Sequence, residues 1–149
     1  MTEKDTVRYA IQCHGNQKYG SMPYIYHLHK VAQLVKKWGG SAEQIQAAYL
    51  HDTVEDTDTT LGDIQHNFGS GVAQLVGLLT NQVSKEATFK RIRTNRSAVL
   101  IKLCDRLANV TEGGKLDKYR KEHPLFKSIL YKPGEFDGLW NELDRLLKV

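Results

Sequence analysis

Cysteine and proline are scarce in this chain of 149 residues, and long apolar runs are absent. Its two cysteines, Cys13 and Cys104, lack the paired spacing of such sites, so the sequence supports neither a disulfide framework nor a zinc knuckle. No apolar run approaches the roughly 18 residues that would cross a membrane. The opening segment, Met1 to Asp5, is polar and does not resemble a secretory signal. We therefore expect no membrane partner and a location in the reducing cytoplasm.

The composition is that of a globular protein, but the charges are unevenly distributed. Hydrophobic residues make up 40% of the chain and charged residues 26%, and we expect one domain over residues 1–149. The net charge is +4, with acidic residues gathered between Glu55 and Asp63 and basic residues between Lys85 and Lys102. A basic wall opposite an acidic metal site would suit a substrate with several phosphates. The alternative for the basic segment is a solvated helix face or a weak nucleic-acid patch, and we do not favour nucleic acid as the partner.

The hydrophobic periodicity predicts an all-α helical bundle, and nothing in the pattern requires a sheet. Ser41 with Gln44 and Thr60 with Asp63 form capping boxes that predict two of the helix starts. A strand is possible for residues 99–103, but the length of the apolar segment favours a helix. Pro124 is interpreted as a break. The expected helices cover Asp5 to about Lys18, Tyr24 to Val35, Ser41 into Asp52, Thr60 to Phe68, Val72 to Leu79, Ser97 to Val110, a charged start at Lys115 to Arg120, and Phe136 to Leu147.

The stretch Tyr49 to Thr57 breaks the local pattern, because four titratable groups follow an apolar run that should continue into the core. On one continuous helix His51 and Glu55 would share a face, and Asp52 and Asp56 a second face about 100° away. One helical turn would thus aim an imidazole and three carboxylates into one cleft. The alternative is an exposed acidic helix end with a capping role.

Three further polar residues lie on predicted buried faces or close to them. His27 precedes Val31 by one turn and should point inward, whereas His29 should be solvated. Asp105 interrupts an apolar helix, and a buried carboxylate needs a metal ion, a cation or hydrogen bonds. A salt bridge to an unidentified lysine or arginine is the alternative for Asp105, since the adjacent Arg106 points elsewhere.

Together these residues predict a mononuclear site for a divalent metal. Two imidazoles and two carboxylates from three helices, His27, His51, Asp52 and Asp105, leave positions for water and a phosphate oxygen. Glu55 and Asp56, one turn along, could hold that water and shuttle its proton.

At this point the sequence resembles the HD superfamily of metal-dependent phosphohydrolases, and within it the hydrolase domain of RelA/SpoT-type enzymes, including small alarmone hydrolases. The resemblance runs from about Tyr9 to Val110. The matching segments are Pro23 to His27, Ala48 to Thr57, Phe68-Gly69 with Val72-Ala73 and Leu75-Val76, and Leu100 to Leu107 with Asn109.

The resemblance implies an HD-domain helical bundle with one manganese ion held by His27, His51, Asp52 and Asp105. It implies that Glu55 and Asp56 position the attacking water, and that pyrophosphate is removed from the ribose 3′ position of guanosine tetra- or pentaphosphate. Lys18 stands where the family has an arginine, and Tyr19 could supply a stacking surface. The predicted substrate contacts are Lys18, Tyr19, Lys102, Arg106 and Asn109.

Two other functions stay open from the residues alone. The same site could act on another phosphorylated nucleotide, for instance the 2′-phosphate of NADPH. A protein of a different class would be a non-catalytic helical module that binds nucleotide or RNA through residues 90–96.

Overall fold

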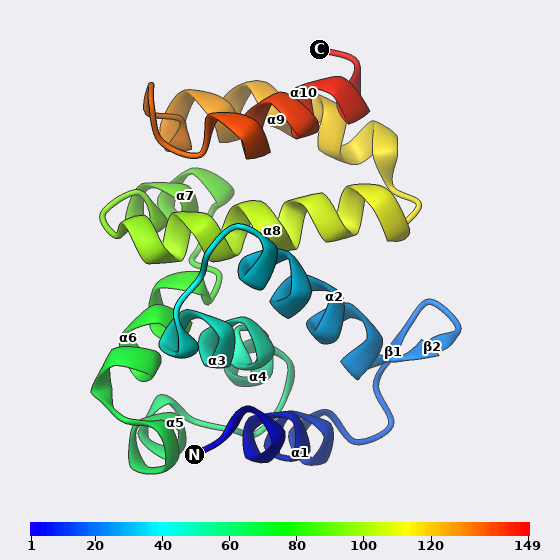
Figure 1. The fold of residues 1–149 in the computed structure, drawn as a ribbon. Coiled ribbons are helices and arrows are strands. Elements are labelled where there is room, and N and C mark those ends of the chain that lie inside the picture. The colour runs from blue at the N-terminus through cyan, green and yellow to red at the C-terminus, as the bar shows by residue number, and fades with distance from the viewer.

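The computed structural model describes residues 1–149, which form ten helices and one short hairpin (Figure 1). In chain order the elements are α1 (Glu3–His14), β1 (Lys18–Tyr19), β2 (Met22–Pro23), α2 (Tyr24–Lys37), α3 (Ala42–Leu50), α4 (Thr53–Asp56), α5 (Leu61–Phe68), α6 (Ser70–Leu79), α7 (Lys85–Ile92), α8 (Arg96–Glu112), α9 (Leu116–Leu130) and α10 (Asp137–Leu147). The all-α prediction is therefore confirmed. None of these helices is both long and apolar enough to cross a bilayer.

Helix α8 is the element on which the others pack. It crosses the middle of the molecule, with α9 and α10 on one side and α2 and α3 on the other (Figure 1). Its buried positions run from Ala98 to Val110 with few interruptions, as expected of a helix with neighbours on several sides. The apolar segment after residue 97 is thus a helix and not a strand.

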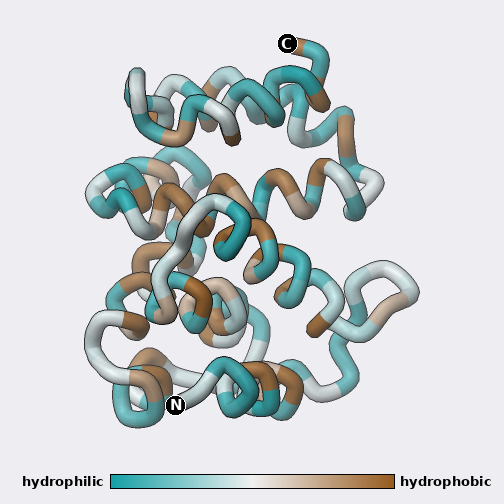
Figure 2. Tube along the Cα trace, in the orientation of Figure 1, coloured by the Kyte–Doolittle hydropathy of each residue, from teal (hydrophilic) through white to brown (hydrophobic).

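The predicted helix starts and apolar faces are largely as the pattern indicated. Both capping boxes form, with the Ser41 and Thr60 side chains accepting backbone N–H bonds from the third residue of α3 and α5. On α2, Leu28, Val31 and Val35 are fully buried. Along the helices, hydrophobic positions recur at the helical period, with hydrophilic positions between them (Figure 2). The sequence period therefore sets which face of α2 meets α3 and α8.

The segment after α1 differs from the prediction. Helix α1 ends at His14, and Gly15, with φ +54°, takes the chain out of it. The expected continuation to Lys18 is wrong, because Lys18 belongs to a two-residue antiparallel strand, β1, which pairs with β2. Strands this short carry no alternation that the sequence pattern could reveal.

Two helices depart from the predicted boundaries farther along the chain. Helix α7 was not expected in the basic segment, yet Ser84 caps it and Phe89 and Ile92 anchor it in the core. Helix α9 continues through Pro124, which was expected to break the chain. Buried Phe126 and Ile129 follow the proline on the same helix, so packing outweighs the lost backbone hydrogen bond.

The C-terminal helix α10 packs on α8 and α9 through its predicted apolar stripe. Its Trp140 and Leu143 are buried. A polar link joins α10 to α9, because Asp144 lies 2.8 Å from His123 Nε2 and 2.6 Å from Lys127 Nζ. Burial alone would raise the pKa of Asp144, but the hydrogen bonds from Lys127 and His123 hold it below its usual range.

Replacing Asp144 with asparagine should lower the free energy of unfolding at pH 7. A carboxyl whose folded-state pKa is depressed stabilises the fold above the unfolded-state pKa and stops doing so as pH falls through the folded-state pKa. We therefore expect the stability difference between wild type and Asp144→Asn to shrink below about pH 4. Urea unfolding at pH 7 and pH 3 measures it, with exposed Asp58→Asn as the control. A constant difference down to pH 3 would contradict the assignment.

Candidate metal centre

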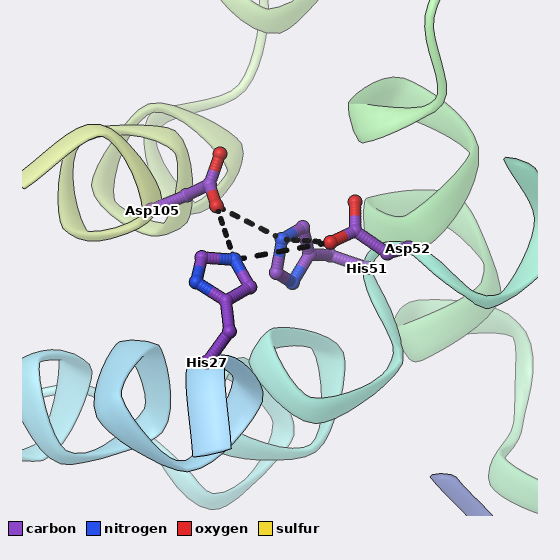
Figure 3. Close-up of side chains that lie close together, drawn as sticks. All are labelled: His27, His51, Asp52 and Asp105. Atoms are coloured by element: carbon purple, nitrogen blue, oxygen red, sulfur yellow. Dashed lines mark hydrogen bonds and ion pairs between the residues drawn. The ribbon is translucent and has the colours of Figure 1, made fainter. Parts of the chain in front are cut away.

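Four side chains from separate parts of the chain converge on one point (Figure 3). Asp105 Oδ1 lies 2.9 Å from His27 Nε2 and 3.2 Å from His51 Nε2. Asp52 Oδ2 lies 3.1 Å from His51 Nε2 and 3.9 Å from His27 Nε2. One ligand atom from each of the four lies within 4.8 Å of the others. The structure therefore brings together the four residues that were predicted to share one ion.

The four candidate ligands come from three parts of the chain. His27 is in the first turn of α2 and Asp105 is in the interior of α8. His51 and Asp52 lie between α3 and α4, so the expected continuous helix through Asp52 is wrong. Neighbouring side chains on a continuous helix diverge by about 100°. Because the helix ends at Leu50, both side chains of the pair can face the same point.

The hydrogen bond of the His51 ring favours metal binding. Its Nδ1 lies 2.6 Å from the carbonyl oxygen of Ala48, which can only accept, so the proton is on Nδ1. In the neutral ring the lone pair is then on Nε2, the nitrogen beside the two carboxylates, where it could bind an ion as in histidines that ligate metals. Two imidazole nitrogens with two carboxylate oxygens suit a borderline or hard divalent cation. The residues present thus fit such an ion.

The electrostatics of the cluster point the same way. Burial would raise the pKa of Asp105, but Lys102 and His51 hold it well below its usual range. Burial opposes protonation of His51, yet the charges of Asp52 and Asp105 raise its pKa well above that of an ordinary histidine. The buried carboxylates therefore stay ionised and attract positive charge, which a divalent cation supplies more fully than a proton.

Two tyrosines surround the ligands. Tyr24 donates a hydrogen bond of 2.7 Å to Asp52 Oδ2. Tyr19 stacks on the His27 ring with centroids 4.6 Å apart and donates a 2.8 Å hydrogen bond to Asn109. Tyr24 was not among the predicted site residues, although it precedes His27 by three positions and so shares its face of the helix. That spacing was the signal that could have identified it.

The four clustered side chains line a cavity, which we call the metal cavity. The two predicted water-positioning carboxylates, Glu55 and Asp56, lie in its wall. Glu55 accepts hydrogen bonds from the backbone N–H of Asn81, at 3.3 Å, and from the Asn81 side chain. Asp56 accepts one of 3.2 Å from Gln17 Nε2, and Gln17 Oε1 in turn lies 2.8 Å from the His14 ring. Both carboxylates are thereby oriented by residues far away in the chain, and these contacts were not predicted from the sequence.

Glu55 has the properties of a proton acceptor. Glu55 is exposed to solvent, and partial desolvation by the cavity wall, together with the charges of Asp52 and Asp56, raises its pKa against the opposing hydrogen bond from Asn81. A carboxylate shifted toward neutral pH holds an abstracted proton more readily than an ordinary glutamate does.

The predicted substrate contacts separate into three groups. Lys102 and Asn109 line the metal cavity, where Lys102 Nζ is 3.3 Å from Asp105 Oδ2. Lys18 and Tyr19 line a neighbouring cavity at the hairpin. Arg106 is buried and lines a third cavity, which opens beside the metal cavity and shares Lys102 and Asn109 with it, so the structure does not place all five around one ligand position.

The predicted basic wall is also only partly formed. Lys85 and Lys102 line cavities at the site, whereas Lys90 pairs with Glu86 on an exposed surface. The remaining basic side chains of the segment, Arg91, Arg93 and Arg96, are exposed. Missing from the prediction were three residues of the cavity wall after α8: Lys115, Lys118 and Tyr119.

Comparison with known families gives one match over most of the chain. Residues 6–123 match the family described as HD domain. The guanosine-3′,5′-bis(diphosphate) 3′-pyrophosphohydrolase MESH1 of Danio rerio is 36% identical over 120 residues, covering 72% of this chain and 67% of the relative. A guanosine-3′,5′-bis(diphosphate) 3′-pyrophosphohydrolase of Aquifex aeolicus is 37% identical over 113 residues, covering 68% of this chain. This chain spans 16% of the Aquifex protein and 55% of human MESH1.

Solved structures show the same fold. A structure described as a metazoan ortholog of SpoT that hydrolyzes ppGpp superposes with a TM-score of 0.82 over 98% of this chain and 93% of that one, at 24% identity. A Listeria monocytogenes crystal structure gives a TM-score of 0.69 at 29% identity, over 85% of this chain and 96% of that one. The predicted HD-type helical bundle is thus confirmed.

Replacing His27 with alanine should weaken the binding of a divalent metal ion by about 100-fold or more, because one of the four candidate ligands is lost. His29→Ala, two positions along the same helix, should leave binding unchanged, since His29 is exposed and contacts Tyr49. Isothermal titration calorimetry with the metal alone measures both. Loss of binding in the His29 variant, or normal binding in the His27 variant, would show that the wrong histidine was chosen.

Proposed function

Since this chain belongs to the HD domain family, we propose that it hydrolyses guanosine-3′,5′-bis(diphosphate), or ppGpp, and its pentaphosphate analogue at the ribose 3′ position. The observation that carries the proposal is the cluster of His27, His51, Asp52 and Asp105 with two further carboxylates in the same cavity wall. Relatives named for this reaction, at 36% and 37% identity, support it.

We infer that the four clustered residues hold one divalent ion, as the family implies, and that manganese is that ion. Nitrogen and oxygen donors together, without a thiolate, suit manganese. When bound there, the ion would lower the pKa of a coordinated water and draw charge from a phosphate oxygen. Tyr24 keeps the Asp52 carboxylate turned toward the cluster by its 2.7 Å hydrogen bond.

In the proposed reaction an oxygen–phosphorus bond forms from water and the bond between phosphorus and the ribose 3′-oxygen breaks. The products are pyrophosphate and the guanosine 5′-diphosphate. Glu55 takes the proton of the attacking water, because its raised pKa and its place in the cavity wall suit that role. Asp56, held by Gln17, orients the same water. The 3′-oxygen leaves with a proton from the solvent or from this carboxylate pair.

Positive and neutral donors complete the cavity. Lys102 reaches it from α8 and meets the negative charge of the phosphate nearest the ribose. Asn109, one turn after Asp105, presents its amide there while accepting the Tyr19 hydroxyl. Lys18 and Tyr19, in the hairpin cavity that shares Lys115 with the metal cavity, are placed to contact the nucleoside.

Purified protein with manganese, incubated with ppGpp, the pentaphosphate, NADPH and ordinary nucleotides, tests the proposal. Release of pyrophosphate from ppGpp in preference to the other compounds is the expected result. Release of orthophosphate from NADPH alone would assign the site to a different nucleotide. No turnover of any compound would favour a binding module without catalytic activity.

Glu55→Gln should retain manganese binding and lose about 100-fold or more of kcat for ppGpp, because the amide cannot accept the proton of water. The amide oxygen can keep one of the two hydrogen bonds from Asn81, and the Asn81 side-chain amide can rotate to accept from the new NH2 group, so the fold is expected to be unchanged. Glu86→Gln, an exposed carboxylate paired only with Lys90, is the matched control. A normal rate in Glu55→Gln would remove this residue from the mechanism.

A further inference from the structure

A second cavity opens directly beside the metal cavity, between α7, α8, α9 and the loop before α7. Its volume is about 290 Å³. The residues common to both cavities are Asn81, Lys102, Asn109, Lys118 and Tyr119. The two spaces are therefore continuous, and a group attached to a phosphorus at the metal centre could extend into the second one.

The second cavity carries more positive than negative charge. Four cationic side chains line it, and Glu122 is its one carboxylate. Lys85 and Arg106 both bond to Glu122, with Arg106 Nη2 at 2.5 Å. Lys102 is shared with Asp105, whereas Lys118 has no ion-pair partner. An anion would balance this surplus.

Arg106, which lines this cavity, has a buried donor without an acceptor. The residue is 3% exposed, and its guanidinium lies 4.6 Å from the Tyr119 ring centroid and 4.2 Å from that of Phe126. Its Nη2 donates to Glu122, but its Nη1 is buried and has no hydrogen-bond partner. A buried N–H group without an acceptor is costly, and anionic oxygen in the cavity is the acceptor that its charge favours.

Lys118 adds positive charge at the exposed rim of this cavity. Burial and then the neighbouring Lys85 lower the pKa of its ammonium group, and Glu122 only partly opposes this. The apolar residues that line the cavity are Val83, Phe89 and Tyr119, spread among polar neighbours. Such a lining suits a phosphate better than a purine, which binds against apolar or aromatic surface.

We propose that this cavity, which we call the anion cavity, binds the terminal phosphate of the 3′-diphosphate, with Lys118, Lys85 and Arg106 as its donors. This inference rests on the proposed function. The phosphorus attacked by water carries the ribose oxygen that leaves, the metal-facing oxygens and the bridge to the terminal phosphate. That bridge directs the terminal phosphate away from the reacting axis, toward the cavity beyond Lys102. The anion cavity thus makes the enzyme select a 3′-diphosphate over a monophosphate.

The test compares Lys118→Gln with Lys121→Gln, an exposed lysine of the same helix that lines neither cavity. In manganese-loaded enzyme, Lys118→Gln should lower kcat/KM for ppGpp about tenfold and raise the inhibition constant of pyrophosphate by a similar factor. In Lys118→Gln the inhibition constant of orthophosphate should not change. If the enzyme hydrolyses the analogue with a 3′-monophosphate, that rate should not change either. Lys118→Glu should abolish inhibition by pyrophosphate, and Lys121→Gln should behave as wild type.

Two outcomes distinguish a failure of the anion-cavity proposal from a failure of the proposed function. If wild type hydrolyses ppGpp but Lys118→Gln and Lys118→Glu match it in kcat/KM and in pyrophosphate inhibition, the anion cavity is wrong and the function stands. If wild type does not hydrolyse ppGpp, calorimetry with pyrophosphate on the manganese-loaded protein still decides. Binding weakened about tenfold in Lys118→Gln supports the cavity, and equal binding by both proteins overturns it.

Discussion

The charge of Asp105 in the middle of α8 is the constraint on which this structure depends. A carboxylate that is 7% exposed must be met by positive charge or hydrogen-bond donors, and α8 itself supplies Lys102 and, at 3.4 Å, the side-chain amide of Asn109. The other partners, His27 and His51, come from α2 and from the end of α3, so both helices must pack against α8 for the charge to be compensated. The same packing that buries the apolar faces therefore assembles the ligand set. Core and active site are in this sense one arrangement, which an ion at the centre would complete.

The residues around the four clustered side chains lie on different sides of the cluster and have different proposed roles. Tyr24 and Tyr19 support the ligands from the hairpin side, while Glu55 and Asp56 lie at the cavity wall formed by α4. Asn81 holds Glu55 and also lines the anion cavity, so one short loop connects the proposed proton acceptor with the position proposed for the terminal phosphate. The nucleoside, the reacting phosphate and the terminal phosphate would then occupy three adjoining spaces. This arrangement agrees with a long, highly charged nucleotide as the substrate.

Much of the arrangement could be predicted from the sequence because it depends on local period and on chemistry that stands out from its surroundings. Helical spacing alone distinguished buried His27 from exposed His29, and the position of Asp105 in an apolar run marked it as a site residue. What could not be predicted depends on contacts between distant segments. The break after Leu50 has no glycine or proline to announce it, and Lys118 reaches the site only because α9 folds back over α8. Short-range pattern carries no information about such approaches.

The break between α3 and α4 has a consequence for how this protein can vary in length. His51 is held by α3 and its bond to the Ala48 carbonyl, while Glu55 is held by α4 and its bonds to Asn81. One residue more or fewer at this junction would rotate α4 by about 100° relative to α3 and move Glu55 out of the cavity. Homologous chains that retain this chemistry should therefore keep an unchanged residue count here, even where insertions and deletions accumulate in the hairpin at Gly20 or in the loop around fully exposed Val83.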